Sequence, residues 1–163
     1  MIAVVAAFTL AIRVPTPVSG GYINLSDVAI FFTAFTFGPL PALVAGGVGA
    51  GLADVISGAP EFSWLSLIAH GLEGLVAGYL FLRMRGSVGM IISSVAGGLL
   101  MVLGYFLGET AVLTGIGPAL AEMPLNVFQA FVGGLLGIAL TLAVRRAYPS
   151  ITQSGRGRQW RQM

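Results

Sequence analysis

The chain has 163 residues, of which 56% are hydrophobic and only 9% are charged, whereas soluble domains carry roughly a quarter charged residues. Together with a mean hydropathy of +0.94, this composition excludes an ordinary soluble domain and indicates an integral membrane protein. The chain has no cysteine, which also excludes disulfides and thiolate metal sites.

The apolar segments predict an all-α membrane protein, a compact bundle of about six transmembrane helices. A helix needs about 20 residues to cross the bilayer, so about six spans with short connections fit into this length. Proline, glycine and polar residues separate the segments. The expected spans are about residues 1–12, 25–37, 40–56, 64–82, 88–107 and 124–145. They form one domain, residues 1–147.

The first segment, residues 1–12, is short, because a dozen residues rise only about 18 Å against a hydrocarbon core of about 30 Å. Two interpretations stay open. Either the true start lies upstream, or the helix continues through Val14 despite Arg13 and Pro15. No basic residue precedes the apolar stretch, which argues against a signal peptide.

The later connections differ in length and composition. Loops rich in turn residues are expected at 15–24 and 57–63, and a tight turn is marked by Gly38, Pro39 and Pro41. The connection 109–123 is longer and is expected to be partly helical. Pro124 is then placed as a first-turn proline of the last span.

All eight basic residues are arginines, and their positions predict the orientation of the chain. Seven of them lie in the turn after the fourth span or at the C-terminal end: Arg83, Arg85, Arg145, Arg146, Arg156, Arg158 and Arg161. The positive-inside rule places these in the cytoplasm, with both termini, and leaves Arg13 outside. We therefore expect a multi-pass protein of a prokaryotic cell membrane. Its polar tail, residues 148–163, is expected to be disordered and to contact anionic lipid headgroups.

Small residues recur at helical spacing, which lets helix backbones approach closely in lipid. The series are Ala3, Ala7 and Ala11; Ala42, Gly46 and Ala50; Gly47 and Gly51; Gly74 and Gly78; and Gly104 and Gly108. Such a stripe either packs inside the bundle or docks a partner helix.

Ionisable side chains within spans are costly, so each is a candidate for function. The acidic ones at or within the spans are Asp27, Asp54, Glu73, Glu109 and Glu122. His70 and Glu73 are three residues apart and share a helix face, as a structural pair or as part of a site. Their HGLEG sequence is not the HExxH pattern of zinc proteases, and no second histidine is present, so no metal site is expected.

Further polar residues gather toward the outer ends of the last two spans. Tyr105 and Glu109 are four residues apart, and Asn126 shares a face with Glu122, with Gln129 nearby. Aromatic, carboxylate and amide groups at one level suit an aromatic or heterocyclic ligand, roofed by the GGYIN loop and Trp64.

Four blocks of sequence resemble the S components of energy-coupling factor (ECF) vitamin transporters. They are YINLSDVAIFFTAFTFGPLPALVAGGVGAGLADVISG (22–58), HGLEGLVAG (70–78), YFLGE (105–109) and AEMPLNVFQAFVGG (121–134). The resemblance extends over about residues 1–147. It implies a small membrane subunit that captures a vitamin or precursor from outside, with the loop after the first span as a lid. Such a subunit docks on a transmembrane coupling subunit driven by two ATPase subunits.

The resemblance also implies residue roles. The stripe of Ala3, Ala7 and Ala11 would dock the coupling subunit, although the short first span departs from the family pattern. The ligand site would comprise Tyr22, Asn24, Trp64, His70, Glu73, Tyr105, Glu109, Asn126 and Gln129. No cofactor, nucleic acid or enzymatic activity is implied, because ATP hydrolysis belongs to the partner chains.

Another class of function stays open from the residues alone. His70, Glu73 and Asp54 could form the relay of a proton- or ion-conducting bundle or of a small membrane enzyme. A third hypothesis is that the chain is a purely structural partner in a larger complex. The ligand is equally open among thiamine-pyrimidine, pyridoxine, riboflavin, queuosine-type and pantothenate compounds.

Overall fold

The computed structural model of the chain describes residues 1–16 and 20–151. Within them, the six expected spans appear as α1 (Ile2–Ala11), α2 (Ser26–Phe37), α3 (Pro39–Ser57), α4 (Ser63–Met84), α5 (Gly86–Gly108) and α6 (Ile116–Ala147). Four segments are long and apolar enough to cross a membrane: Pro39–Ser57, Pro60–Met84, Gly86–Leu113 and Ile116–Ala147. The predicted all-α membrane bundle is confirmed. The predicted tail lies, from residue 152 on, outside the described residues.

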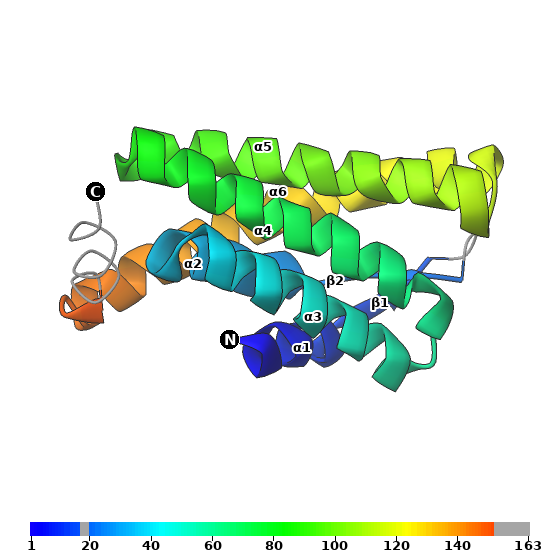
Figure 1. Cartoon of the computed structure of the whole chain (residues 1–163), viewed down its shortest axis with the longest axis horizontal. Helices are drawn as coiled ribbons and strands as arrows, with labels where there is room; N and C mark the ends of the chain where they lie inside the picture. The colour runs from blue at the N-terminus through cyan, green and yellow to red at the C-terminus, as the bar shows by residue number, and fades with distance from the viewer. Residues whose placement is uncertain (17–19, 152–163) are drawn as a thin grey trace.

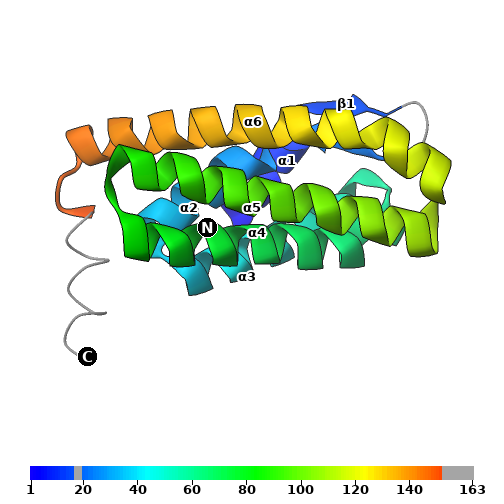
Figure 2. The same ribbon diagram turned by 90° about the horizontal axis from the view of Figure 1, so that it is seen from above.

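The helix α2 occupies the centre of the bundle. Its neighbours α1, α3, α4 and α6 all pack against it, and ten of its twelve residues are buried. The longer helices α3 to α6 pack in sequence, each against the next, and run along the long axis of the molecule (Figures 1 and 2). The helix α2 rises only about 18 Å, so the longer helices packed around it extend beyond it.

Glycines bring the backbones of α3 and α4 into contact. A Cβ atom on Gly47 would lie 2.5 Å from the carbonyl oxygen of Leu67, and one on Gly74 would lie 2.7 Å from that of Ala42. Both distances are too short for any side chain, so these positions require glycine. The glycine pairs therefore pack within the bundle.

The alanine stripe of α1 faces the other way. Ala3, Ala7 and Ala11 are exposed, whereas Val5 and Thr9 form the buried side of this helix. The stripe is therefore not used for packing within the described residues, and its surface is open to lipid or to a partner.

The two ends of the bundle differ. One end holds the antiparallel hairpin of β1 (Arg13–Pro15) and β2 (Tyr22–Asn24), where only a loop was expected. The turn Pro60–Phe62 and the π-helical turn Glu109–Leu113 lie at the same end (Figure 2). We call this the hairpin end. The opposite end carries the turn at Gly38, whose φ of +94° suits glycine.

The helix α6 begins earlier than predicted. It starts at Ile116, directly after Gly115, and Pro124 lies in its interior rather than in its first turn. The prediction is wrong because one interior proline removes a single backbone hydrogen bond, which this 32-residue helix tolerates. At about 48 Å the helix exceeds the bilayer core, and its first turns reach the hairpin end.

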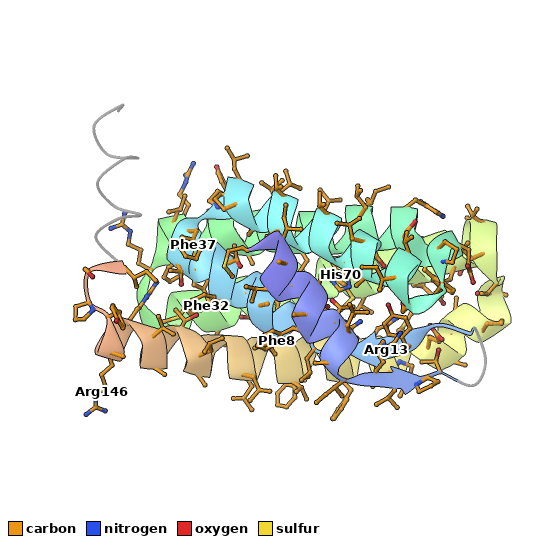
Figure 3. The ribbon with its side chains drawn as sticks, turned by 90° about the horizontal axis from the view of Figure 1, so that it is seen from below. Phe8, Arg13, Phe32, Phe37, His70 and Arg146 are labelled. Atoms are coloured by element: carbon orange, nitrogen blue, oxygen red, sulfur yellow. The ribbon has the colours of Figure 1, made fainter. Side chains whose placement is uncertain are left out.

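The described arginines lie in two places, at opposite ends of the long axis. Those at the ends of α4 and α6 gather at the end opposite the hairpin: Arg83, Arg85, Arg145 and Arg146. Arg13 on β1 lies at the hairpin end, and Figure 3 shows it far from Arg146.

Candidate functional site

A polar cavity lies at the hairpin end, between the hairpin and the helices α3 to α6. Its lining consists of Gly21, Tyr22, Asn24, Asp54, Phe62, Ser66, Tyr105, Glu109, Glu122, Asn126 and Gln129. The structure thus brings together six of the nine residues that the sequence suggested for a ligand site: Tyr22, Asn24, Tyr105, Glu109, Asn126 and Gln129. The first turns of α6 complete the wall.

Tyr22 fastens the hairpin to α3. Its hydroxyl donates a hydrogen bond to Oδ1 of Asp54 at 2.6 Å and lies 2.9 Å from Oγ of Ser57. Burial and the hydrogen bond to Asp54 raise the pKa of the Tyr22 hydroxyl, so it stays a neutral donor. The guanidinium of Arg13 stacks over the same ring, 5.7 Å from its centroid.

Gln129 connects the hairpin to the floor of the cavity. Its Oε1 accepts the backbone N–H of Asn24 at 2.7 Å, and its Nε2 donates to Oδ1 of Asp27 at 3.0 Å. Asn24 in turn accepts the backbone N–H of Ser26 at 2.7 Å, at the start of α2. One side chain of α6 therefore links the hairpin with the central helix.

The floor consists of His70, Glu73 and Asp27, each at most 1% exposed. Nδ1 of His70 lies 2.8 Å from Oε2 of Glu73 and 3.6 Å from Oδ1 of Asp27. Figure 3 places His70 within the helix bundle, and its ring meets that of Tyr105 edge-on at 5.6 Å. The predicted pair lies beneath the cavity, and α2 adds Asp27, which local spacing along α4 could not reveal.

The same three residues are the described group best suited to a metal ion, since their ligand atoms lie within 4.8 Å of one another. One nitrogen and two carboxylate oxygens would suit zinc or another transition metal. Two ligands of one tetrahedral zinc are, however, about 3.3 Å apart. The 2.8 Å separation of His70 and Glu73 is that of a direct hydrogen bond.

Trp64 does not line the cavity and is 40% exposed. Two residues along a helix turn it by about 200°, so Ser66, which does line the cavity, faces almost the opposite way. Phe62 lines the cavity as well, and neither it nor Ser66 was singled out from the sequence. Asp54 and Glu122 also belong to the lining. The sequence placed Glu122 in the polar group of the last two spans and Asp54 in a possible relay, but assigned neither to the ligand site.

The cavity is small. Its free space is about 20 Å³, which holds about one water molecule, whereas sites for drug-sized ligands measure roughly 300–1,000 Å³. A ligand can therefore enter only if the hairpin or the lining side chains move outward.

A larger groove of about 320 Å³ lies between α5 and α6. Its walls are almost wholly apolar, with Ser94 as a polar exception and bulky residues such as Val95 and Phe131. In a membrane protein such a surface faces lipid, and it offers no hydrogen bonds to a water-soluble ligand.

Comparison with known proteins points to one family. The family model described as "ECF-type riboflavin transporter, S component" matches residues 1–146. A Pyrococcus woesei protein described as "Uncharacterized protein in gap 3'region" is 37% identical over 142 residues, 87% of this chain and 95% of that protein. The thiamine precursor transporter HmpT of Lactococcus lactis subsp. cremoris (strain MG1363) is 35% identical over 136 residues, 81% of this chain and 75% of that protein.

Proposed function

Because this chain belongs to the family of S components of ECF-type transporters, we propose that it captures a water-soluble vitamin or vitamin precursor at the outer face of the membrane. As a member, it is a multi-pass substrate-binding subunit of a transporter and not an enzyme. The specific ligand, the partner subunits and the orientation are part of the proposal.

The polar cavity at the hairpin end is the observation that carries this proposal. Amide, hydroxyl and carboxylate groups converge there from six different elements, as expected for recognition of a polar heterocycle. We assign Tyr22, Asn24, Tyr105, Glu109, Asn126 and Gln129 to ligand contacts. His70 and Glu73 form the floor that a ligand reaches once the hairpin opens. We leave Trp64 out because it points away from the cavity.

Partner docking is assigned to α1. The family associates with other ECF components, and we propose a transmembrane coupling subunit that carries two ATPase subunits. Ala3, Ala7 and Ala11 present a flat, exposed stripe that allows a partner helix to approach closely.

The orientation follows from the arginines. The end with Arg83, Arg85, Arg145 and Arg146 is proposed to face the cytoplasm of a prokaryotic cell. The hairpin and the cavity then face outward, where the hairpin acts as a lid.

The family description and the lactococcal relative name two different ligands, riboflavin and a thiamine precursor. Both are nitrogen heterocycles, and we propose that class for this chain. Native mass spectrometry of the purified protein would detect a co-purified ligand, and calorimetry in detergent would measure the affinity for riboflavin and for the thiamine pyrimidine.

The site assignment is tested by Asn126→Ala and Glu73→Ala. Each removes a hydrogen-bonding group at or beneath the cavity, so the affinity for the captured compound should fall by about tenfold or more. Glu61→Gln, on an exposed turn outside the cavity lining, serves as the control. Unchanged affinity in both alanine variants would refute the assignment.

The alternative of a proton- or ion-conducting relay through His70, Glu73 and Asp54 has less support. All six acidic residues of the chain lie at the hairpin end, at the floor of the cavity or in the turn with Glu61. The path has no acidic group to continue it toward the arginine end. Proton flux into liposomes that contain this chain alone would favour the relay.

A further inference from the structure

We propose that the ligand of this cavity is a single-ring nitrogen heterocycle that presents amino N–H groups and carries no negative charge, a conclusion that rests on the proposed function and narrows its ligand class. An aminopyrimidine is the simplest member of this class. The acidic residues of the cavity, its unsatisfied acceptors and its size point to this class.

Carboxylates dominate the cavity. Five of the six acidic residues of the chain either line it or form its floor: Asp54, Glu109, Glu122, Asp27 and Glu73. Among the described arginines, Arg13 is exposed and stacks over the hairpin tyrosine, and the others lie at the opposite end. A ligand carboxylate or phosphate would normally be held by arginine or lysine. The described lining of the cavity contains acidic residues and no arginine.

Several carboxylate oxygens lack a hydrogen-bond donor. Oδ2 of Asp54, Oδ2 of Asp27 and Oε1 of Glu73 are buried and accept no hydrogen bond from the described residues. Asp54 lines the cavity directly and is 5% exposed, and its other oxygen accepts the hydrogen bond from Tyr22. Buried acceptors without a donor are rare in folded proteins. Amino and ring N–H groups of a ligand would supply the missing donors.

The amide donor at the floor is already used. Nε2 of Gln129 donates to Asp27, and its Oε1 accepts from the hairpin backbone. The Gln129 amide therefore offers no free donor to a ligand, whereas the carboxylate oxygens named above are free to accept. The aromatic rings of Tyr22, Phe62 and Tyr105 in the lining provide faces on which a flat or cationic ring can stack.

The size of the cavity favours one ring. Since its free space is only about 20 Å³, a pyrimidine requires much less displacement of the hairpin than the three fused rings of a flavin. A small, donor-rich ring suits the chemistry of the lining and requires the smaller opening of the hairpin.

A matched pair of probes tests the inference on the full chain in detergent. The first is 4-amino-5-hydroxymethylpyrimidine, and the second is its 4-oxo analogue, which replaces the amino donor with an acceptor. We expect the amino probe to bind at least about tenfold more tightly in calorimetry, the ratio for one charge-assisted hydrogen bond. Pantothenate, an anion, should not bind.

The other outcomes separate the inference from the proposed function. Equal affinity for the two pyrimidines, binding of pantothenate, or binding of riboflavin without the amino probe would overturn the ligand class but leave a capturing subunit. One equivalent of bound metal in elemental analysis would also overturn it, because a cation would then satisfy Asp27 and Glu73. If a folded protein binds none of the probes and carries no co-purified ligand, both proposals fail.

Isosteric variants locate the effect. Asp54→Asn and Glu73→Gln replace an acceptor with an amide that can donate to the oxo analogue, so each should lower the preference for the amino probe by about tenfold. Asp54→Asn keeps the test valid if the buried Glu73→Gln does not fold. Glu61→Gln is the matched control and should keep the full preference. An unchanged preference in every folded variant would overturn the inference.

Discussion

At the scale of single residues, Gln129 is the side chain on which most of the site's geometry depends. It reaches the hairpin backbone at Asn24 on one side and Asp27 in the central helix on the other, at 2.7 and 3.0 Å. Asp27 has no access to water, because it is fully buried. The Gln129 amide therefore joins the hairpin to the buried acid beneath it.

Replacing this amide should loosen the lid. In Gln129→Ala the Asn24 N–H and Asp27 each lose one hydrogen bond, which should destabilise the closed hairpin by about 1–3 kcal/mol. Hydrogen exchange at residues 22–24 should accelerate accordingly. Asn126→Ala is the control, because Asn126 lines the same cavity, whereas the hydrogen bond to the Asn24 N–H comes from Gln129. Equal protection in wild type and Gln129→Ala would contradict this role.

At the scale of secondary-structure elements, close helix contacts and an exposed helix face have different roles. The glycines of α3 and α4 let two backbones touch, with 2.5 Å left for a Cβ atom at Gly47. This contact fixes the rotation of α4, and with it the position of His70. The alanines of α1 make no such contact and remain available to a partner.

The tight helix contact predicts a large effect of one methyl group. Gly47→Ala should lower the stability of the protein by about 1–3 kcal/mol, because the added atom must push α3 and α4 apart. Gly117→Ala is a matched control in α6, where nothing lies within 4 Å of the new atom, and its effect should stay within about 0.5 kcal/mol. Thermal unfolding in detergent compares them, and equal melting temperatures would refute the packing role.

A bulky substitution in the exposed alanine stripe should impair assembly with the coupling subunit and leave ligand binding intact. Ala7→Trp should block docking of the coupling subunit through steric clash, while ligand affinity stays unchanged because α1 does not line the cavity. Co-purification with the ECF coupling subunit measures docking, and calorimetry measures ligand affinity. Leu103→Trp, at an exposed position of α5, controls for bulk in the membrane. Normal co-purification of Ala7→Trp would remove the stripe from the proposed interface.

At the scale of the whole molecule, opposite charges occupy opposite ends. The acidic residues gather at or beneath the hairpin end, and four described arginines gather at the other. Arg145 also has a structural contact there, since its Nη2 donates to the carbonyl of Phe35 at 2.7 Å. This polarity is the basis of the proposed orientation, in which the hairpin end faces outward and the arginine end faces the cytoplasm.

The lack of cysteine makes the orientation directly testable. Glu61→Cys on the hairpin end and Ser87→Cys on the arginine end both place a thiol at an exposed position. A membrane-impermeant maleimide added to intact cells should label only Glu61→Cys, and Ser87→Cys should react after permeabilisation. The reverse pattern would invert the proposed orientation.

Much of the architecture was predictable from the sequence because local composition decides it. Long apolar segments must form helices in lipid, since every backbone polar group there needs a partner within its own segment. Turn residues mark the connections, and helical periodicity places His70 beside Glu73. Arginine positions indicate a direction across the membrane. None of these features depends on how the helices are packed.

Only the tertiary structure decided which residues from different helices meet. Asp27 joins His70 because α2 is enclosed by its neighbours, and Trp64 faces outward because the contacts of α4 fix its rotation. The hairpin and the early start of α6 likewise depend on contacts across the bundle. The sequence by itself determined a six-helix membrane protein with polar residues toward one end, and packing turned those residues into a cavity rich in carboxylates.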